Sequence, residues 1–283
     1  MQNYFGALSG YVDDLKLLSF KGSEMQKDTE NLVKWLKENK LPINIDKCSL
    51  MYFETKRPFN QEGIECSIDG TVLQSVKFVK DLGINVDANF SFKYHVENIR
   101  KKTYRLINLC FRIFSSRNTD LYIAFYKTYI VSQISYCSSI FCSTSIHNLD
   151  CIEKIQRYFT KRLYIRVFSR SCDVSYTERL QIFKLESLES YYCKVDIVNL
   201  FKIMYCNLFS PGIIIPHSPR RPNRLCVSRV HSTARRAFFI HRTVMLWNRY
   251  LSFADLSSLN HLKSYLANQT LSAHIKGSAF KAQ

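Results

Sequence analysis

The hydrophobic periodicity of this chain changes once, near residue 91, and that change constrains the fold more than any other feature. Before it, strand-like alternation over residues 7–12 and 15–20 precedes an amphipathic segment, 24–41, and a further short strand follows at 48–53. After it, apolar residues recur at helical spacing over 92–116, 121–143, 148–168, 177–183, 188–207 and about 234–267. We therefore expect an α+β N-terminal part over residues 1–90 and a mostly α-helical remainder.

Local signals give these elements their ends and their buried faces. Ser23 and Gln26 have the spacing of a capping box at the start of the 24–41 helix, and Asp69-Gly70 is typical of a two-residue hairpin turn. Four prolines between residues 211 and 222 predict a loop. An apolar stripe is expected on each long helix, formed by Val96, Ile99, Leu106 and Ile113 on the first and by Ile152, Ile155, Phe159 and Leu163 on the other.

Charge is distributed unevenly along the chain. The 283 residues contain 40 Lys and Arg against 23 Asp and Glu, a formal net charge of +17. Residues 1–98 hold 12 basic and 14 acidic side chains, whereas residues 99–283 hold 28 and 9. A long basic segment favours binding to a polyanion such as nucleic acid, although a generally basic solvated surface gives the same count.

The cysteine pattern and the N-terminus bear on the compartment. The ten cysteines include no CxxC pair and no histidine pair at zinc-finger spacing, so no zinc site is predicted. The first residues lack the features of a signal peptide, and Lys127 and Gln133 interrupt the most apolar stretch, 121–143. We expect an intracellular protein, nuclear or cytoplasmic, that is neither secreted nor bound to a membrane.

Two adjacent aspartates stand between the first two predicted strands, in the sequence Tyr11-Val12-Asp13-Asp14. One interpretation is an ordinary turn, because Asp tolerates turn dihedrals and accepts hydrogen bonds from nearby amides. The other is a metal site, since neighbouring carboxylates repel one another until a divalent cation neutralises them. Two Mg²⁺ ions held by such carboxylates can activate an attacking 3′-oxygen and stabilise a leaving pyrophosphate.

The order of motifs resembles the reverse transcriptase of a non-LTR, LINE- or jockey-like retrotransposon, a transposable element. Tyr11-Val12-Asp13-Asp14 is similar to the metal-binding hairpin of the palm, and "LPINIDKCSLMYF", with Asn44, Lys47 and Cys48, is similar to the following motif. "VKFVKDLGINVDANFSFKYHVENIRKK" resembles the primer grip running into the thumb, with Leu82-Gly83 and His95 at matching positions. "LYIAFYKTYIVSQISYCSSIF", "CIEKIQRYFTKRLYIR" and "FFIHRTVMLWNRYL" resemble later helices of these polymerases.

This resemblance implies three regions: a partial palm (1–90), a helical thumb (91–145) and a basic helical C-terminal extension (146–283). It implies that Asp13 and Asp14 bind Mg²⁺ and that Lys47 protonates the leaving pyrophosphate. RNA template and DNA primer are the implied partners, contacted by Tyr11, Leu82, Gly83, Arg100, Lys101, Lys102 and Arg105. In the C-terminal extension we expect nucleic-acid contacts from Arg220, Arg221, Arg224, Arg235, Arg236 and Arg242, with Phe238, Phe239, His241 and Trp247 either stacking on bases or forming core.

The family's other metal-binding aspartate lies on a strand upstream of the hairpin, as do its fingers, and neither fits into the ten residues before Tyr11. We therefore expect the C-terminal half of a polymerase, inactive alone, with the N-terminal half as a further partner. Two alternatives stay open. The chain is a non-catalytic RNA- or DNA-binding protein derived from such an element, or it is an unrelated helical interaction protein in which the aspartate pair is accidental.

Overall fold

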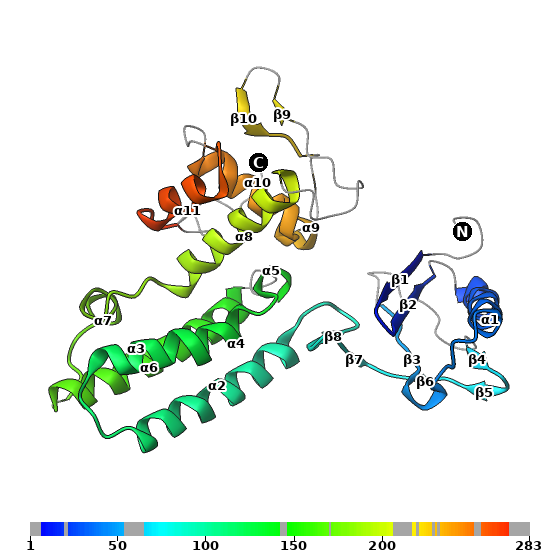
Figure 1. Cartoon of the computed structure of the whole chain (residues 1–283), viewed down its shortest axis with the longest axis horizontal. Helices are drawn as coiled ribbons and strands as arrows, with labels where there is room; N and C mark the ends of the chain where they lie inside the picture. Colours follow the sequence, from blue (N-terminus) through cyan, green and yellow to red (C-terminus); the bar gives the residue numbers. More distant parts are fainter. Residues whose placement is uncertain are drawn as a thin grey trace. The chain divides into compact units, whose positions relative to one another are not determined.

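The computed structural model describes residues 7–19, 22–53, 65–141, 146–169, 171–205, 217–218, 221–227, 230, 233–251 and 256–271. The chain divides into two compact units, residues 1–90 and residues 91–283 (Figure 1). Most of the described strands lie in the first unit, and helices make up most of the second. The protein is therefore an α+β mixture. None of the helices in the described segments has the length and apolar character that a bilayer-spanning segment needs.

The first unit contains four small two-stranded sheets and one long helix within its described residues. Strands β1 (Ala7–Tyr11) and β2 (Asp14–Leu18) pair antiparallel, and helix α1 (Gly22–Glu38) follows. After the 3₁₀ turn η1 (Ile45–Lys47), β3 (Ser49–Leu50) pairs in parallel with β6 (Gln74–Ser75). Antiparallel pairs are formed by β4 (Ser67–Ile68) with β5 (Thr71–Val72), and by β7 (Phe78–Asp81) with β8 (Ile84–Asp87).

Helix α1 is fastened to the β4–β5 hairpin by polar side chains. The Gln26 amide donates to the Ser67 carbonyl at 3.2 Å and accepts from the Ser67 amide at 2.8 Å, as a neighbouring strand would. Gln26 of the predicted capping box thus bonds Ser67, and the Ser23 side chain of that prediction lies outside the described part of the structure. The expected Asp69-Gly70 turn is confirmed, since both residues have positive φ, +49° and +82°, as a type I′ turn requires.

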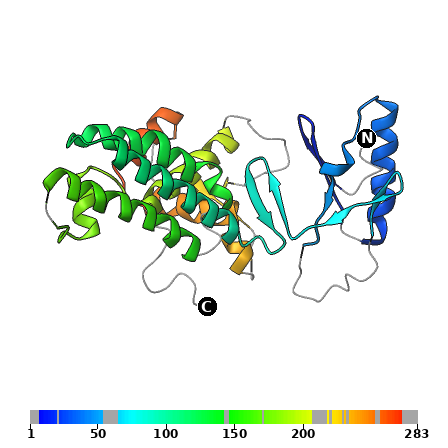
Figure 2. The same ribbon diagram turned by 90° about the horizontal axis from the view of Figure 1, so that it is seen from below.

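The second unit begins with three long helical segments that lie side by side (Figures 1 and 2). They are α2 (Lys93–Ile113); the α3 (Thr119–Phe125), η2 (Tyr126–Val131) and α4 (Ser132–Ser135) segment; and α6 (Ile146–Phe168). The helix expected over 121–143 is thus interrupted. Its η2 stretch is a π-helix, and it breaks at Cys137, where φ is +52°, before the short α5 (Ser138–Phe141).

The buried faces of α2 and α6 test the predicted apolar stripes. Ile152, Ile155, Phe159 and Leu163 of α6 are all fully buried, as predicted. On α2, however, Ile113 is 62% exposed, and the buried side chains are His95, Val96, Thr103, Ile107, Cys110 and Phe111. Steps of seven residues drift around an α-helix, so the predicted stripe left the core face by its end.

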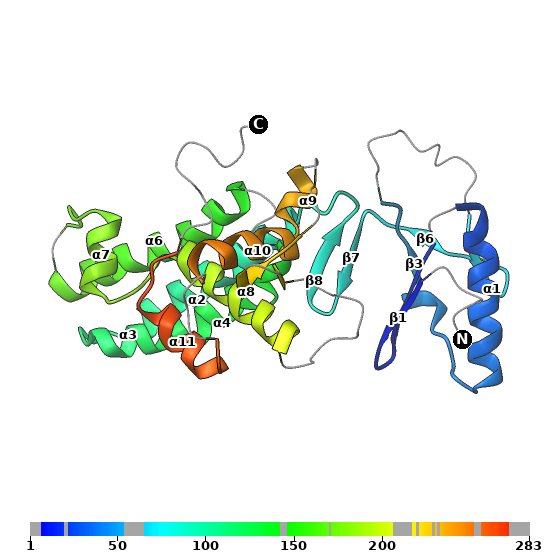
Figure 3. The same ribbon diagram turned by 90° about the horizontal axis from the view of Figure 1, so that it is seen from above.

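A second core lies where α8 (Leu188–Tyr205) meets α10 (Phe239–Tyr250) and α11 (Leu259–Ala267) (Figure 3). Leu200, Trp247 and Leu262 are fully buried there. Helix α7 (Tyr176–Ile182) precedes α8 in the sequence, and α9 (Thr233–Ala237) directly precedes α10. The expected proline-rich loop, where it is described, holds a short antiparallel pair, β9 (His217–Ser218) and β10 (Arg221–Leu225).

Candidate functional site

The two aspartates lie at the tip of the β1–β2 hairpin. Tyr11 pairs with Asp14, which leaves Val12 and Asp13 as a two-residue loop. Tyr11, Val12 and both carboxylates are exposed, and Val12 is the most exposed at 88%. The prediction that Asp13 and Asp14 occupy a hairpin tip is confirmed. Their carboxylates are therefore accessible to a ligand.

Val12 adopts a backbone conformation that a β-branched residue rarely takes. Its φ of +56° lies in the left-handed region, which costs a non-glycine residue about 1–2 kcal/mol. Since Val12 is almost fully exposed, no packing of its side chain repays that cost. Such backbone strain is often found in functional loops, and Val12 is one of nine described non-glycine residues with a positive φ in this chain.

The donor set at this tip does not by itself make a magnesium site. Mg²⁺ requires nearly octahedral coordination by oxygen, commonly with one or two carboxylates plus substrate phosphates and water. Across the described segments, no group of three or more His, Cys, Asp or Glu side chains converges as a metal site would require. Two carboxylates of one hairpin are fewer ligands than Mg²⁺ takes, so water, substrate phosphates or further side chains would have to complete such a site.

An ion pair connects this hairpin to the one that carries the predicted primer-grip residues. Lys16 Nζ on β2 lies 2.6 Å from Asp81 Oδ1 at the end of β7. The next two residues, Leu82 and Gly83, form the β7–β8 turn with φ of +44° and +87°, again the type I′ pattern. The two motifs are thus neighbours within the first unit. Lys47 is exposed at the end of η1.

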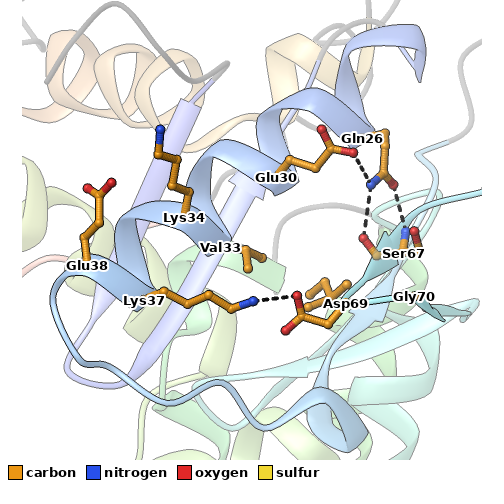
Figure 4. Close-up of a pocket in the computed structure, with 10 residues that line it drawn as sticks. Gln26, Glu30, Val33, Lys34, Lys37, Glu38, Ser67, Asp69 and Gly70 are labelled. Carbon is orange, nitrogen blue, oxygen red and sulfur yellow. Dashed lines mark hydrogen bonds and ion pairs between the residues drawn. The ribbon is translucent and has the colours of Figure 1, made fainter.

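A shallow hollow of about 460 Å³ lies between α1 and the β4–β5 turn (Figure 4). Its lining mixes charges of both signs, and the Lys37–Asp69 ion pair of 2.6 Å crosses it. None of the predicted catalytic residues lines it. The hollow therefore adds no group to the hairpin site.

The predicted basic residues of α2 fall into two classes. The Arg100 guanidinium makes two hydrogen bonds to the Glu97 carboxylate, at 2.8 and 2.9 Å, and this bonding holds the pKa of Glu97 below its ordinary value. Lys101 is 3.8 Å from the same carboxylate, whereas Lys102 and Arg105 are exposed. Arg100 is therefore mainly engaged with its own helix, while its neighbours present charge to solvent.

His95, predicted at the start of the thumb, is a core residue. Its ring packs edge-on against Phe141, with centroids 4.7 Å apart, and burial lowers its pKa. A neutral imidazole held in this way contributes packing at the start of α2.

Arg242 differs most from its predicted role as a nucleic-acid contact. Its side chain is only 12% exposed, and its Nε donates to Asp196 Oδ2 on α8 at 2.9 Å. The other guanidinium nitrogens donate to the carbonyls of Ala237 and Ser139, at 2.8 and 2.6 Å. Arg242 thus ties three segments of the second unit together, and these bonds leave it little capacity for phosphate.

The other residues predicted for the C-terminal nucleic-acid surface differ in their exposure and bonding. Arg224 and Arg235 are exposed, and Arg236 donates to the Val230 carbonyl at 3.2 Å. Arg221 belongs to β10, and Arg220 lies outside the described residues. Of the aromatic residues, Phe238 is exposed but Trp247 is fully buried, so Trp247 is core and not a stacking platform.

Sequence reasoning overlooked two features of the second unit. Asp196 and Glu153 are buried carboxylates, and Glu153 accepts hydrogen bonds from the Tyr176 hydroxyl and from the first amides of α8. The part of α6 beside α2 carries Lys154, Lys161 and Arg162. The second feature was readable as a run of basic residues without an acidic one, but only a structure places it next to α2.

Comparison with known proteins gives no assignment. No family model matches the chain, and no solved structure matches it. One curated protein that it resembles is "Uncharacterized protein B0403.1" of Caenorhabditis elegans, 26% identical over 99 residues, which are 35% of this chain and 48% of that protein. The chain thus spans about half the length of this relative, whose printed name states no activity.

Proposed function

We propose that these residues form part of an RNA-directed DNA polymerase of the non-LTR retrotransposon type. In this proposal, residues 1–90 are the remainder of a palm, and the second unit is a thumb with a basic extension that contacts RNA template and DNA primer. The observation that carries the proposal is the Tyr11–Asp14 sequence at the exposed tip of a tight hairpin with a strained Val12. A turn chosen only for its chain reversal would favour glycine or asparagine at that φ.

The arrangement of the first unit adds support. The hairpin, helix α1 and the short strand after Asn44 follow in the order that the resemblance implies. The Lys16–Asp81 ion pair then joins the aspartate hairpin to the Leu82-Gly83 hairpin, the candidate primer grip. A catalytic hairpin and a primer grip act on the same primer terminus, so proximity of the two is what this function needs.

Residues 1–283 alone should bind RNA or DNA but should not extend a primer. Binding follows from the basic excess, because each phosphate neutralised by Lys or Arg releases condensed counterions. Extension should fail because phosphoryl transfer needs the charge-stabilising groups held in place, and losing that geometry costs orders of magnitude in rate. Two carboxylates on one hairpin do not provide that arrangement.

The test is primer extension on an RNA template, with and without a separately expressed N-terminal half of a related polymerase. We expect no product from the chain alone and some product with the added half, which Asp13→Asn should abolish. Asp69→Asn is the matched control, because it makes the same change at another exposed hairpin turn of the same unit. Template-dependent extension by residues 1–283 alone would contradict the incomplete-site argument, and equal activity of the two variants would remove the catalytic role of Asp13.

A non-catalytic RNA- or DNA-binding function is the second candidate. The observation that favours it is the concentration of positive charge in the second unit, 28 basic against 9 acidic residues from position 99 onward. Under this alternative, nucleic-acid binding is retained, Asp13→Asn has no effect on any activity, and no partner restores extension.

A further inference from the structure

Helices α2 and α6 run parallel and in contact, which brings two distant basic segments together. The Tyr104 hydroxyl donates to the Lys154 carbonyl at 3.4 Å, and the Tyr158 hydroxyl donates to Asn108 Oδ1 at 2.7 Å. Both contacts join residues 50 positions apart, and this constant offset is what parallel helices produce. The Tyr104 and Tyr158 rings also pack together, with centroids 4.7 Å apart.

Each helix contributes a long window without a carboxylate. No Asp or Glu occurs between residues 98 and 119 or between residues 154 and 172. The nearest acidic residues on these helices are Glu97 on α2 and Glu153 on α6, of which Glu153 is buried, and Asp150 lies one turn closer to the N-terminus of α6. In the described part of these windows the cations are Arg100, Lys101, Lys102, Arg105 and Arg112 on α2, and Lys154, Arg157, Lys161, Arg162 and Arg166 on α6.

Some of these cations are structural. Arg166 donates to the Phe111 and Phe114 carbonyls, at 2.8 and 3.1 Å, and so satisfies the C-terminal end of α2. Arg162 lies in the seam, where it donates to Asn108 and to the Tyr158 hydroxyl and covers the Phe111 ring. These two side chains fix the spacing of the helices.

Five of the remaining cations form one exposed face. On α2, Lys101, Arg105 and Arg112 are exposed and separated by four and seven residues, which places them on one stripe of the helix. On α6, Lys154 and Lys161 are exposed and seven residues apart. We call these five residues the α2–α6 basic face. With a rise of 1.5 Å per residue, the α2 stripe is roughly 16 Å long.

The carboxylates near this face do not neutralise it. Glu97 lies 3.8 Å from Lys101, and Asp150 lies 2.8 Å from Lys154 and 3.8 Å from Arg157. All these groups are partly exposed to solvent, where ion pairs are weak and screened by salt. A phosphate can therefore displace these carboxylates at little cost. The other three cations of the face, Arg105, Arg112 and Lys161, lie in the stretches of α2 and α6 that contain no carboxylate.

We propose that the α2–α6 basic face binds the phosphodiester backbone of a nucleic acid, with α6 contributing as directly as α2. The inference rests on the nucleic-acid-binding half of the proposed function and is independent of its polymerase half. Two parallel rows of cations, held apart by the Tyr104–Tyr158 seam, suit a strand that lies along the helix pair. Because the contacts are to phosphate, binding is insensitive to base sequence.

The test is a salt series of binding isotherms with the full chain and a labelled 20-nucleotide single strand, as DNA and as RNA, with a duplex in parallel. Arg105→Gln on α2 and Lys161→Gln on α6 each remove one phosphate contact. For a single strand, each should flatten the slope of log affinity against log salt by about 0.7, and both together by about 1.4. The single changes then weaken binding roughly 2.6-fold more at 50 mM salt than at 200 mM salt.

Lys263→Gln is the control, since Lys263 is exposed on α11 and the charge change is the same. It should leave the slope unchanged, and thermal melting should show all variants equally folded. A normal slope for Lys161→Gln with a reduced slope for Arg105→Gln would overturn the contribution of α6. If both variants kept the salt slope of the unmodified chain, the proposed phosphate contacts of this face would be refuted. They would also be refuted if the variants lost affinity only for anionic lipid vesicles and not for nucleic acid. Failure of primer extension even with the added N-terminal half, while the slope effects are present, would count against the polymerase proposal alone.

Discussion

The buried Arg242–Asp196 ion pair should be the most sensitive charged contact of the second unit. Asp196 is only 5% exposed at its side chain, and its two oxygens accept from Arg242 Nε at 2.9 Å and from the Ser139 hydroxyl at 2.6 Å. Arg242→Met removes the cation but leaves the carboxylate in the interior. Removing one partner of a buried pair typically costs about 3–5 kcal/mol. The Ser139 and Ala237 carbonyls also lose their donor.

This cost is measurable because each unit contains one tryptophan. Trp35 lies in α1 of the first unit and Trp247 lies in α10, fully buried in the second. In a Trp35→Phe background, urea unfolding followed by fluorescence therefore reports the second unit. With a urea slope of about 2 kcal/mol per molar, the loss lowers the unfolding midpoint by roughly 2 M.

Two further variants distinguish the loss of this buried ion pair from the general effect of replacing an arginine. Arg249→Met on the same helix, where the side chain is exposed, should change the free energy of unfolding by less than about 0.5 kcal/mol. Arg242→Met combined with Asp196→Leu should cost clearly less than the sum of the single changes, since no unpaired charge stays buried. A loss below about 1 kcal/mol for Arg242→Met would refute the assignment of this arginine to the interior.

Three other expectations follow from single residues. Burial lowers the pKa of His95 in the folded state, so near the ordinary histidine pKa of about 6.5 the unfolded state binds more protons than the folded state. The free energy of unfolding of the second unit should therefore fall from pH 7.5 to pH 5.5. Urea titrations at both pH values should show this fall, and His95→Gln should reduce it. Val12→Gly should stabilise the first unit by about 1 kcal/mol in thermal melts by relieving the φ of +56°, whereas Val72→Gly, in an exposed strand, should destabilise it. Calorimetry should detect no micromolar Mg²⁺ binding; such binding, abolished by Asp13→Asn, would show that the hairpin carries more ligands than its two carboxylates.

The sequence predicts elements well where the pattern is local and long. The α6 core positions repeat at three- and four-residue steps over a helix of 23 residues, and all four were buried as predicted. The hairpin turns were also predictable, because Asp69-Gly70 and the two aspartates combine turn residues with flanking strands. The π-helix at Tyr126–Val131 carries no comparable signal, since its residues are as apolar as those of a regular helix.

Side-chain roles were less predictable because they depend on partners far away in the sequence. Arg235 and Arg242 belong to one basic run, yet the first is exposed and the second is bonded to Asp196, 46 positions earlier. Gln26 likewise had the spacing of a helix cap but pairs with Ser67, 41 positions later. The composition of a segment gives its net charge, and only tertiary packing determines which charges reach solvent.

The way the aspartate hairpin is held explains why accessible carboxylates alone do not make a polymerase. Every residue of β1 is exposed, and an isolated two-stranded hairpin is at best marginally stable in water. The described attachment of β2 includes the Lys16–Asp81 ion pair, which is about one-third exposed on each side and is therefore worth at most about 1 kcal/mol. Catalytic groups must be held within about 0.5 Å by locked neighbours. An element that packs along β1 would supply that rigidity together with further ligands, so a gain in hairpin order and a gain in extension activity should appear together when the N-terminal half is added.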